Sequence, residues 1–294
     1  MYSNGIRVTH VEIGEDGRPR VGYEDLNNNG HKTIVDADRV IMADGSNSRL
    51  RHVFVAASTD VPQYAGYVAW RGVVKESEAS KATHEAIGTS FLVHKSSPNY
   101  ILVYTIPGPT GSNKVGERLF NFVWYNQISE TSEEFRTIMT DVNGHRHRTT
   151  IPPGLMDTEV WECQKSYGRK VLAPPFIELV EKTEQPFIST VREAHAFRSS
   201  YHEGRIMTIG DALATFRPHI AMSVNQAALN CLHLERMLDG EITAQEWTME
   251  VERYSRATAR LSTLAGDFVM FGISMRLLLS AAAYLWELAL NSVF

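Results

Sequence analysis

Alternating apolar and polar positions open the chain. Residues 6–13 and 21–23 show this alternation, turn residues lie at 15–17 and 27–30, and a third apolar run covers 39–43. Such alternation predicts half-buried strands, and Asp-Gly or Asn-Gly turns predict tight connections between them. The first part of the chain therefore reads as a β-meander, which is typical of the middle of an α/β domain.

The pattern then changes to runs rich in aromatic and β-branched residues. These runs, at 67–74, 100–104 and 119–125, predict the strands of an antiparallel sheet. Helical spacing appears at 133–140, and the pair 174–175 is Pro-Pro, which predicts a loop. We interpret this part as a separate sheet domain that faces a substrate.

An α/β pattern resumes in the last third of the chain. A short buried-type strand is expected at 206–209, and helices are expected at 221–238 and 244–265. The remainder, 268–294, is strongly apolar, but charged residues bracket a run of only ten apolar positions. That length is too short to span a bilayer, so we expect a helix that docks on the protein or lies at a membrane interface.

These changes divide the chain into four segments. The expected fold class is α/β with α+β mixing: residues 1–60 and 191–265 form a partial doubly wound domain, residues 61–190 form the antiparallel-sheet domain, and residues 266–294 form an apolar helix.

Composition narrows the class of function. The 294 residues are 43% hydrophobic and 21% charged, as in ordinary globular proteins. The formal net charge of −5, with scattered basic residues, argues against a nucleic-acid surface. Cys163 and Cys231 are isolated, which excludes a disulfide framework and a Cys-rich metal site. With no signal peptide at the start, the expected location is the cytoplasm.

Two strand-to-turn motifs carry the candidate chemistry. The first is Asp44-Gly45, followed by Ser48 and Arg51. Glycine at a strand end lets a phosphate approach the backbone, and Ser48 and Arg51 suit either an anchor for the turn or contacts to a diphosphate. Taken alone, Asp44 is better explained by turn formation or helix capping.

The second motif is Gly210-Asp211, at the end of the strand expected at 206–209. A carboxylate there can accept hydrogen bonds from a ribose or ribitol hydroxyl, although turn formation explains an isolated Asp equally well. The helix expected to begin near Ala221 would direct its N-terminal amides, and the positive end of its dipole, at a bound group.

These motifs resemble those of a known family. The pattern A-D-G-x-x-S-x-x-R at 43–51 is similar to that of group A FAD-dependent monooxygenases, the p-hydroxybenzoate hydroxylase-like family. The stretch from Gly210 to His219 resembles the second flavin motif of that family. Two further stretches, 67–72 and 121–125, resemble its 2,6-dihydroxypyridine 3-hydroxylase-like branch. The resemblance covers residues 6–265 in family order.

The resemblance implies a Rossmann-like FAD-binding domain and an aromatic hydroxylase. FAD would be the cofactor, NAD(P)H the cosubstrate and O2 the oxidant, and a small aromatic or N-heteroaromatic substrate would lie against the sheet of 67–74 and 119–125. It implies cofactor-binding roles for Asp44, Gly45, Ser48, Arg51, Gly210, Asp211, Arg217, Pro218 and Ser223. His219 is the catalytic candidate, and a structural histidine is an equal alternative.

The sequence also departs from the family pattern. Ser223 stands where relatives usually carry glycine, Asn230 stands where they carry an acidic residue, and no G-x-G-x-x-G segment of a first βαβ unit is present. A second hypothesis is therefore a flavin-free, truncated homologue that acts as a binding or accessory protein, or a non-functional fragment. A homodimer and peripheral membrane contact through the C-terminal helix are further options.

Other candidate residues are given structural interpretations. His145 and His147 have an H-x-H spacing, but we read them as part of a basic, solvated loop without a Cys or acidic partner, so no metal site is expected. Arg71 and Tyr125, with the tryptophans beside them, are interpreted as sheet core rather than as catalysts.

Overall fold

The computed structural model describes residues 2–54, 62–96, 99–195 and 198–293. It forms two compact units. Unit 1 comprises residues 1–63, 192–269 and 273–294, and unit 2 comprises residues 64–191 and 270–272. Both contain helices and sheets, which confirms the expected mixed α/β class.

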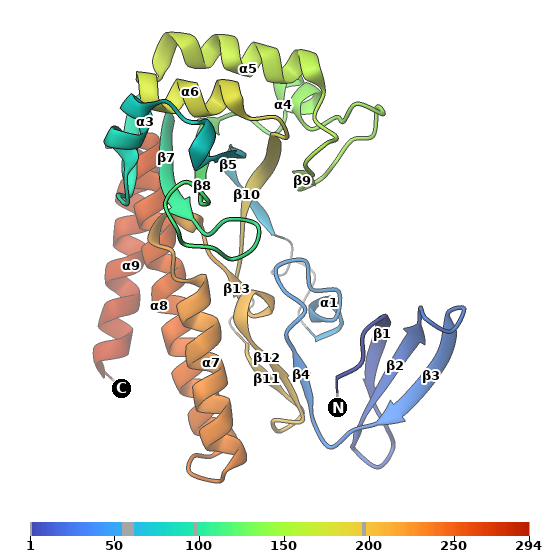
Figure 1. The fold of residues 1–294 in the computed structure, drawn as a ribbon. Coiled ribbons are helices and arrows are strands. Elements are labelled where there is room, and N and C mark those ends of the chain that lie inside the picture. The colour runs from blue at the N-terminus through green and yellow to red at the C-terminus, as the bar shows by residue number, and fades with distance from the viewer. Residues whose placement is uncertain (1, 55–61, 97–98, 196–197, 294) are drawn as a thin grey trace. The chain divides into compact units, whose positions relative to one another are not determined.

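A three-stranded antiparallel meander begins unit 1. It consists of β1 (Ile6–Ile13), β2 (Pro19–Asp25) and β3 (His31–Asp36) in the order β1-β2-β3 (Figure 1). Asn29 and Gly30 have φ of 51° and 73° in the turn before β3, a conformation that asparagine and glycine tolerate. The sequence interpretation was wrong about the third strand, because β3 forms the meander and the run at 39–43 pairs elsewhere.

That run forms a small parallel pairing. β4 (Val40–Met42) lies parallel to β12 (Ile206–Thr208), and β11 (Ser200–Tyr201) flanks β12 on its other side. Val40 pairs with Ile206 and Met42 with Thr208, so strands more than 160 residues apart end at the same edge. Their contact buries Met42 and Ile206 in one apolar cluster.

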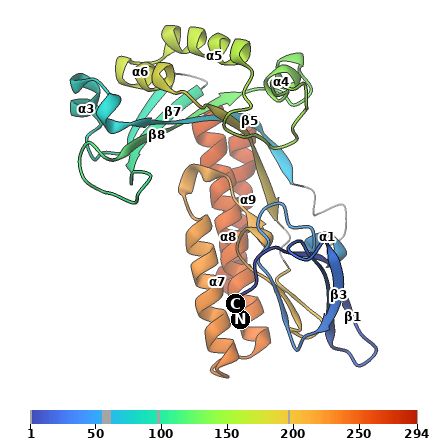
Figure 2. The same ribbon diagram turned by 45° about the vertical axis from the view of Figure 1, so that its right-hand side comes forward.

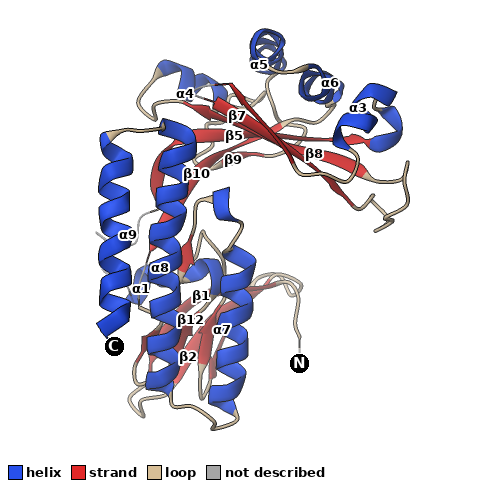
Figure 3. Ribbon diagram, turned by 90° about the vertical axis from the view of Figure 1, so that its left-hand side faces the viewer, coloured by secondary structure: helices blue, strands red, loops and turns tan. Residues whose placement is uncertain are grey.

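Long helices complete unit 1. α1 (Arg51–Phe54) is a single turn, whereas α7 (Ser223–Leu238), α8 (Ala244–Phe271) and α9 (Met275–Val293) are long, and α8 lies alongside both α7 and α9 (Figures 1 and 3). The expected boundary at 265/266 falls inside α8.

The C-terminal helix packs along α8. Arg256 of α8 contacts Glu287 of α9 at 3.4 Å, and Glu287 is buried. Met275, Leu285 and Trp286 on the same helix remain exposed. Within the described residues, no helix combines the length and apolarity that a membrane crossing requires.

A twisted antiparallel sheet forms the centre of unit 2, with the order β10-β5-β8-β7-β6 and with β9 beside β10. Its strands are β5 (Gln63–Lys75), β6 (Leu92–Ser96), β7 (Asn99–Ile106), β8 (Leu119–Gln127), β9 (Thr150–Ile151) and β10 (Phe187–His195). In unit 1, the end of β10 pairs with β13 (Ala214–Thr215). The aromatic and β-branched runs seen in the sequence lie in β5, β7 and β8.

Helices cover one face of this sheet (Figure 2). They are α3 (Lys81–Ile87), α4 (Glu133–Ile138), α5 (Thr158–Val171) and α6 (Pro174–Lys182). Between α5 and the sheet, Trp161 lies beside Trp70 and Tyr167 stacks on Trp124. The pair Pro174-Pro175 begins α6 rather than a loop, because proline fits the first turn of a helix, where its missing N–H has no partner to lose.

Candidate functional site

The Asp44-Gly45 turn follows β4 and leads into α1. Asp44 accepts hydrogen bonds from the backbone N–H of Arg49 at 3.0 Å and of Leu50 at 3.5 Å, so its carboxylate holds the start of the helix. Gly45 has φ +80°, and a Cβ added there would meet no atom within 4 Å. The turn therefore has open space on the side where a side chain would project.

Arg51 connects the two motifs inside unit 1. Its side chain is 1% exposed, and its Nη1 donates to the carbonyl of Ala212 at 3.1 Å, next to Asp211. Its backbone N–H donates to Oγ of Ser48 at 3.1 Å. Ser48 and Arg51 thus anchor the turn, one of the two roles that the sequence left open for them. Ser48 precedes α1, and Arg51 is its first residue.

The Gly210-Asp211 turn follows β12 and is held by α7. The N–H of Gly210 donates to Oδ1 of Asn230 at 2.9 Å, and Nε2 of Gln226 donates to the carbonyls of Gly210 at 2.9 Å and Ala214 at 2.8 Å. Sequence reasoning singled out Asn230 only as a departure from the family pattern and missed Gln226. Only the folded position of α7 reveals their roles.

Burial and hydrogen bonding set the state of Asp211. Burial raises the pKa of its carboxyl above the ordinary value, and the hydrogen bond from Ser223 acts in the opposite direction. Ser223 is the first residue of α7, because Ala221 has left-handed backbone at φ 52° and cannot begin the helix. The helix starts two residues later than expected, and no side chain caps its first amides among the described residues.

Both turns therefore lie at one edge. β4 and β12 are parallel and adjacent, and the N–H of Ile209 donates to the carbonyl of Met42 at 3.1 Å. In α/β sheets, ligands bind at the carboxyl ends of adjacent parallel strands, where the turns expose backbone N–H groups.

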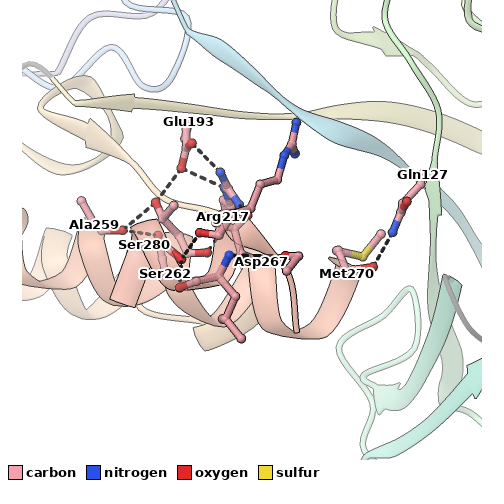
Figure 4. Close-up of polar contacts among 12 residues, drawn as sticks. Gln127, Glu193, Arg217, Ala259, Ser262, Asp267, Met270 and Ser280 are labelled. Carbon is pink, nitrogen blue, oxygen red and sulfur yellow. Dashed lines mark hydrogen bonds and ion pairs between the residues drawn. The ribbon is translucent and has the colours of Figure 1, made fainter. Parts of the chain in front are cut away.

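Arg217 is engaged in a buried ion-pair cluster (Figure 4). Its Nε and Nη2 donate to the two carboxylate oxygens of Glu193 at 2.9 Å and 2.7 Å, and its Nη1 donates to Asp267 of α8 at 2.7 Å. Thr263 donates to the same Glu193 carboxylate at 2.9 Å. The guanidinium holds the loop after the second motif against α8 and β10, so a direct contact to a cofactor remains a prediction.

Pro218 and His219 follow within a single 3-10 turn. Burial and the nearby positive charge of Arg217 lower the pKa of His219 to about 4, so its ring is neutral at pH 7. A Cβ on Gly266 of α8 would lie 3.0 Å from the His219 ring, which marks the close packing there. The catalytic role expected for His219 is not tested by these contacts.

The face of the unit 2 sheet opposite α5 and α6 carries a tyrosine cluster with Arg71. Tyr125 lies 4.8 Å from Tyr100 and 6.0 Å from Tyr67 between ring centroids. Burial raises the pKa of Tyr125 and the Arg71 guanidinium opposes that rise, which indicates that its charge lies close to the phenol. The Nε of Arg71 is buried and has no hydrogen-bond partner among the described residues.

Residues 270–272 lie over one end of that face. Nε2 of Gln127 donates to the carbonyl of Met270 (Figure 4), and the ring of Phe271 lies 6.3 Å from that of Tyr67. Arg71 lies further along the sheet, where its guanidinium is 5.8 Å from the ring of Phe187.

The histidine loop differs from its sequence interpretation in one respect. Nε2 of His147 lies 2.7 Å from a carboxylate oxygen of Asp141, so an acidic partner is present where none was expected. Within the described residues, no group of three side chains has the composition and spacing of a metal site.

Comparison with known proteins finds similar sequences for part of the chain. Residues 64–193 match the FAD binding domain-like family model. Over 189 residues the chain is 33% identical to the 2,6-dihydroxypyridine 3-monooxygenase of Paenarthrobacter nicotinovorans, covering 64% of this chain and 45% of that protein. The chain is homologous to FAD-dependent monooxygenases. The match spans less than half the length of that relative.

Solved structures agree with this homology at the level of the fold. A 2,6-dihydroxypyridine-3-hydroxylase from Arthrobacter nicotinovorans superimposes with a TM-score of 0.77 at 24% identity, covering 91% of this chain and 65% of that one. HpxO of Klebsiella pneumoniae, solved with FAD and uric acid, superimposes with a TM-score of 0.63 at 20% identity. The superposition covers 96% of this chain and 62% of HpxO. Both solved structures share the fold of the chain described here.

The turns of unit 1 fit a flavin dinucleotide of the kind that the homologous monooxygenases use. Gly45 offers backbone without a side chain, and the first turn of α7 offers amides without a side-chain cap. Both features suit the anionic and hydroxyl groups of FAD.

Proposed function

We propose that this chain acts as an FAD-dependent monooxygenase that hydroxylates a small aromatic or N-heteroaromatic substrate. The observation that carries the proposal is the meeting of Asp44-Gly45 and Gly210-Asp211 at the ends of β4 and β12. Bound FAD would pass two electrons from NAD(P)H to O2, so that one oxygen atom enters the ring and the other leaves as water.

In this proposal the residues of the chain position the groups that react. The backbone at Gly45 and the amides that begin α7 would contact the cofactor, and Asp211 would accept a hydrogen bond from one of its hydroxyls. Arg51, Gln226 and Asn230 would act as positioning residues, since each fixes a turn rather than contacting the cofactor. His219 would stay the catalytic candidate, with a ring that is neutral at pH 7.

For the substrate, we propose the face of the sheet that carries Arg71, Tyr100 and Tyr125. Aromatic side chains suit a flat ring. The Nε of Arg71 has no hydrogen-bond partner among the described residues, which favours a substrate that is acidic or anionic. Uric acid, which is bound in the HpxO structure, and 2,6-dihydroxypyridine, in the name of the curated relative, are suitable first probes.

Cofactor binding is tested by a matched pair of glycine variants. Gly45 and Gly17 both have positive φ, +80° and +77°, and both have open space where a Cβ would project. Gly45→Ala and Gly17→Ala should therefore cost similar stability, about 1 kcal/mol each. The proposal expects a yellow wild-type protein in which only Gly45→Ala weakens FAD affinity, measured by quenching of flavin fluorescence. An equal effect of both variants would contradict it.

The alternative is a flavin-free binding protein. Ser223 favours it, because its side chain stands at the start of α7 and hydrogen-bonds Asp211 in place of a ligand. A colourless protein that FAD cannot reconstitute, and that Ser223→Gly does not turn yellow, would support this alternative.

The substrate assignment is tested separately. In the FAD-loaded protein, Arg71→Gln should raise the KM for uric acid or 2,6-dihydroxypyridine about tenfold or more, because a charge-assisted hydrogen bond is worth roughly 1.5–3 kcal/mol. Arg169→Gln is the control, since Arg169 is exposed on α5 and pairs with Glu181. Equal KM values for the two variants would reject a role for Arg71.

A further inference from the structure

The C-terminal helix α9 carries buried polar residues and exposed apolar ones. It lies alongside α8 (Figure 3), and the buried carboxylate of Glu287 is 3.4 Å from Nε of Arg256 on that helix. Ser280, seven residues before Glu287, is also buried and lies on the same side of α9. A surface helix normally has the opposite arrangement, with its apolar stripe toward the core. The side of α9 that faces away from α8 is therefore the kind of surface that proteins usually bury.

Seven apolar residues form that side, which we call the outer face of α9: Met275, Leu278, Leu279, Ala282, Leu285, Trp286 and Ala289. All seven are exposed, and the five large side chains among them are each between 60% and 70% exposed. Their positions repeat every seven residues, the spacing with which two helices interlock along a shared seam. The outer face therefore has the pattern of a helix that packs against another helix.

The outer face is symmetric about Ala282. Leu279 and Leu285 lie three residues from it on either side, and Leu278 and Trp286 lie four residues from it. In an antiparallel pair of α9 helices that cross at Ala282, Leu279 of one copy meets Leu285 of the other, and Leu278 meets Trp286. A twofold contact between identical chains requires such a self-complementary surface.

Small residues fall where two such helices would come closest. Ala282 would face Ala282 of the other copy at the crossing, and helices approach more closely where the side chains between them are small. Seven residues from the crossing, Met275 would meet Ala289, so a long side chain lies opposite a short one. Large against small is the way in which facing side chains fill a helix contact without a clash.

The area of the outer face is sufficient for a specific contact. Five large side chains that each expose roughly 100 Å², together with the two alanines, would bury roughly 600 Å² per copy, or roughly 1,200 Å² in a pair. Specific interfaces bury about 1,200–2,000 Å², and monomers rarely expose apolar patches larger than a few hundred Å². The area therefore favours a protein partner and an affinity at the weak end of the range.

Charge argues against a lipid surface as the occupant. Helices that lie at a membrane interface carry several Lys or Arg residues beside their apolar face. Residues 275–293 contain one cation, Arg276, and the side of α9 with Ser280 and Glu287 is buried. The net charge of −5 gives the chain no general attraction to anionic lipids. A second copy of the chain matches the outer face better.

We propose that the outer face of α9 joins two copies of this chain in a twofold homodimer, with the two α9 helices antiparallel and crossing at Ala282. Each apolar pair occurs twice across the axis, because the two copies are equivalent. Burial of apolar area drives the association, so added salt should not weaken it. The proposal concerns assembly and is independent of whether the chain binds FAD.

Association is tested on the full chain by sedimentation velocity at concentrations from about 1 to about 100 µM, suited to a small interface. Leu279→Glu with Leu285→Glu places four carboxylates at the crossing and should raise the Kd of the dimer roughly 30-fold or more. The control, Leu232→Glu with Leu238→Glu, changes two similarly exposed leucines of α7 that are also six residues apart, and should leave the Kd unchanged. A wild type that stays monomeric throughout, or an equal effect of both pairs, overturns the proposal.

The antiparallel crossing is tested by disulfide cross-linking in a background where the two natural cysteines, the exposed Cys163 and Cys231, are replaced by serine. Ala282→Cys brings two thiols together at the axis and should cross-link under mild oxidation. Ala289→Cys is the control, since Ala289 is also exposed on the outer face. Its two copies would lie roughly 20 Å apart along the helices, beyond the limit of about 7 Å between the Cα atoms of a disulfide. Cross-linking of both variants, or of neither, overturns the antiparallel dimer.

Vesicles of phosphatidylcholine and phosphatidylserine test the lipid alternative. The wild-type protein should stay in the supernatant when such vesicles are sedimented. If it sediments with them, and if Leu279→Glu with Leu285→Glu abolishes that binding, the outer face contacts lipid and the dimer is overturned.

Discussion

The buried cluster around Arg217 gives the sharpest prediction about stability. Arg217 is 6% exposed and contacts two carboxylates, those of Glu193 and Asp267 (Figure 4). Arg217→Met removes the guanidinium that pairs with buried Asp267 and with the largely buried carboxylate of Glu193, which costs about 3–5 kcal/mol in comparable sites. Asp267→Asn leaves the two-pronged contact to Glu193 intact, so it should cost only about 1–2 kcal/mol.

Native-state hydrogen exchange is the suitable assay, because two units need not unfold in one step. Peptides from α8 and from the loop at 210–220 should lose protection by about 3–5 kcal/mol in Arg217→Met and by about 1–2 kcal/mol in Asp267→Asn. Peptides from β7 and β8 in unit 2 should change little. Arg217→Lys should recover only part of the loss, since an ammonium cannot form the planar fork. A cost for Asp267→Asn equal to that for Arg217→Met would refute the reasoning, as would a loss spread evenly over both units.

Three further predictions concern single groups. Asn230→Ala removes the acceptor of the buried Gly210 N–H and should lower the free energy of unfolding, measured by urea denaturation, by about 1–3 kcal/mol. Asn225 is an exposed neighbour on α7, and Asn225→Ala should lower it by less than about 0.5 kcal/mol, as surface substitutions usually do. Arg118 holds the pKa of Glu76 at about 2. The stabilising contribution of Glu76 is therefore complete above about pH 4.5 and is lost as the pH falls toward 2. The difference in unfolding free energy between wild type and Glu76→Gln, about 2 kcal/mol at pH 7, should shrink by pH 3. Burial lowers the pKa of His219 from 6.5 to about 4, so protonation favours the unfolded chain. The stability of unit 1 should therefore fall between pH 6.5 and pH 4 in wild type but not in His219→Gln. Parallel pH profiles of the two proteins would contradict this prediction.

Local patterns determined much of the fold. Alternation identified β1, because a half-buried strand carries an apolar residue at every second position. Runs of aromatic and β-branched residues identified β5, β7 and β8. The Asp-Gly and Gly-Asp turns were recognised from residue type, and their resemblance to the flavin motifs of a family led to the prediction of a cofactor edge. Helices such as α6 were missed, since a proline pair at a helix start looks the same as a loop signal.

Tertiary structure alone decided which residues meet. The pairing of β4 with β12, rather than with the meander, joins strands more than 160 residues apart, and no local pattern records that choice. The same holds for Arg217, whose partners Glu193 and Asp267 lie 24 and 50 residues away. The sequence by itself therefore predicted many of the elements and the residue types at the two turns, because these depend on neighbouring residues. Only the folded chain decided which side chains fasten the turns, because that depends on packing between distant segments.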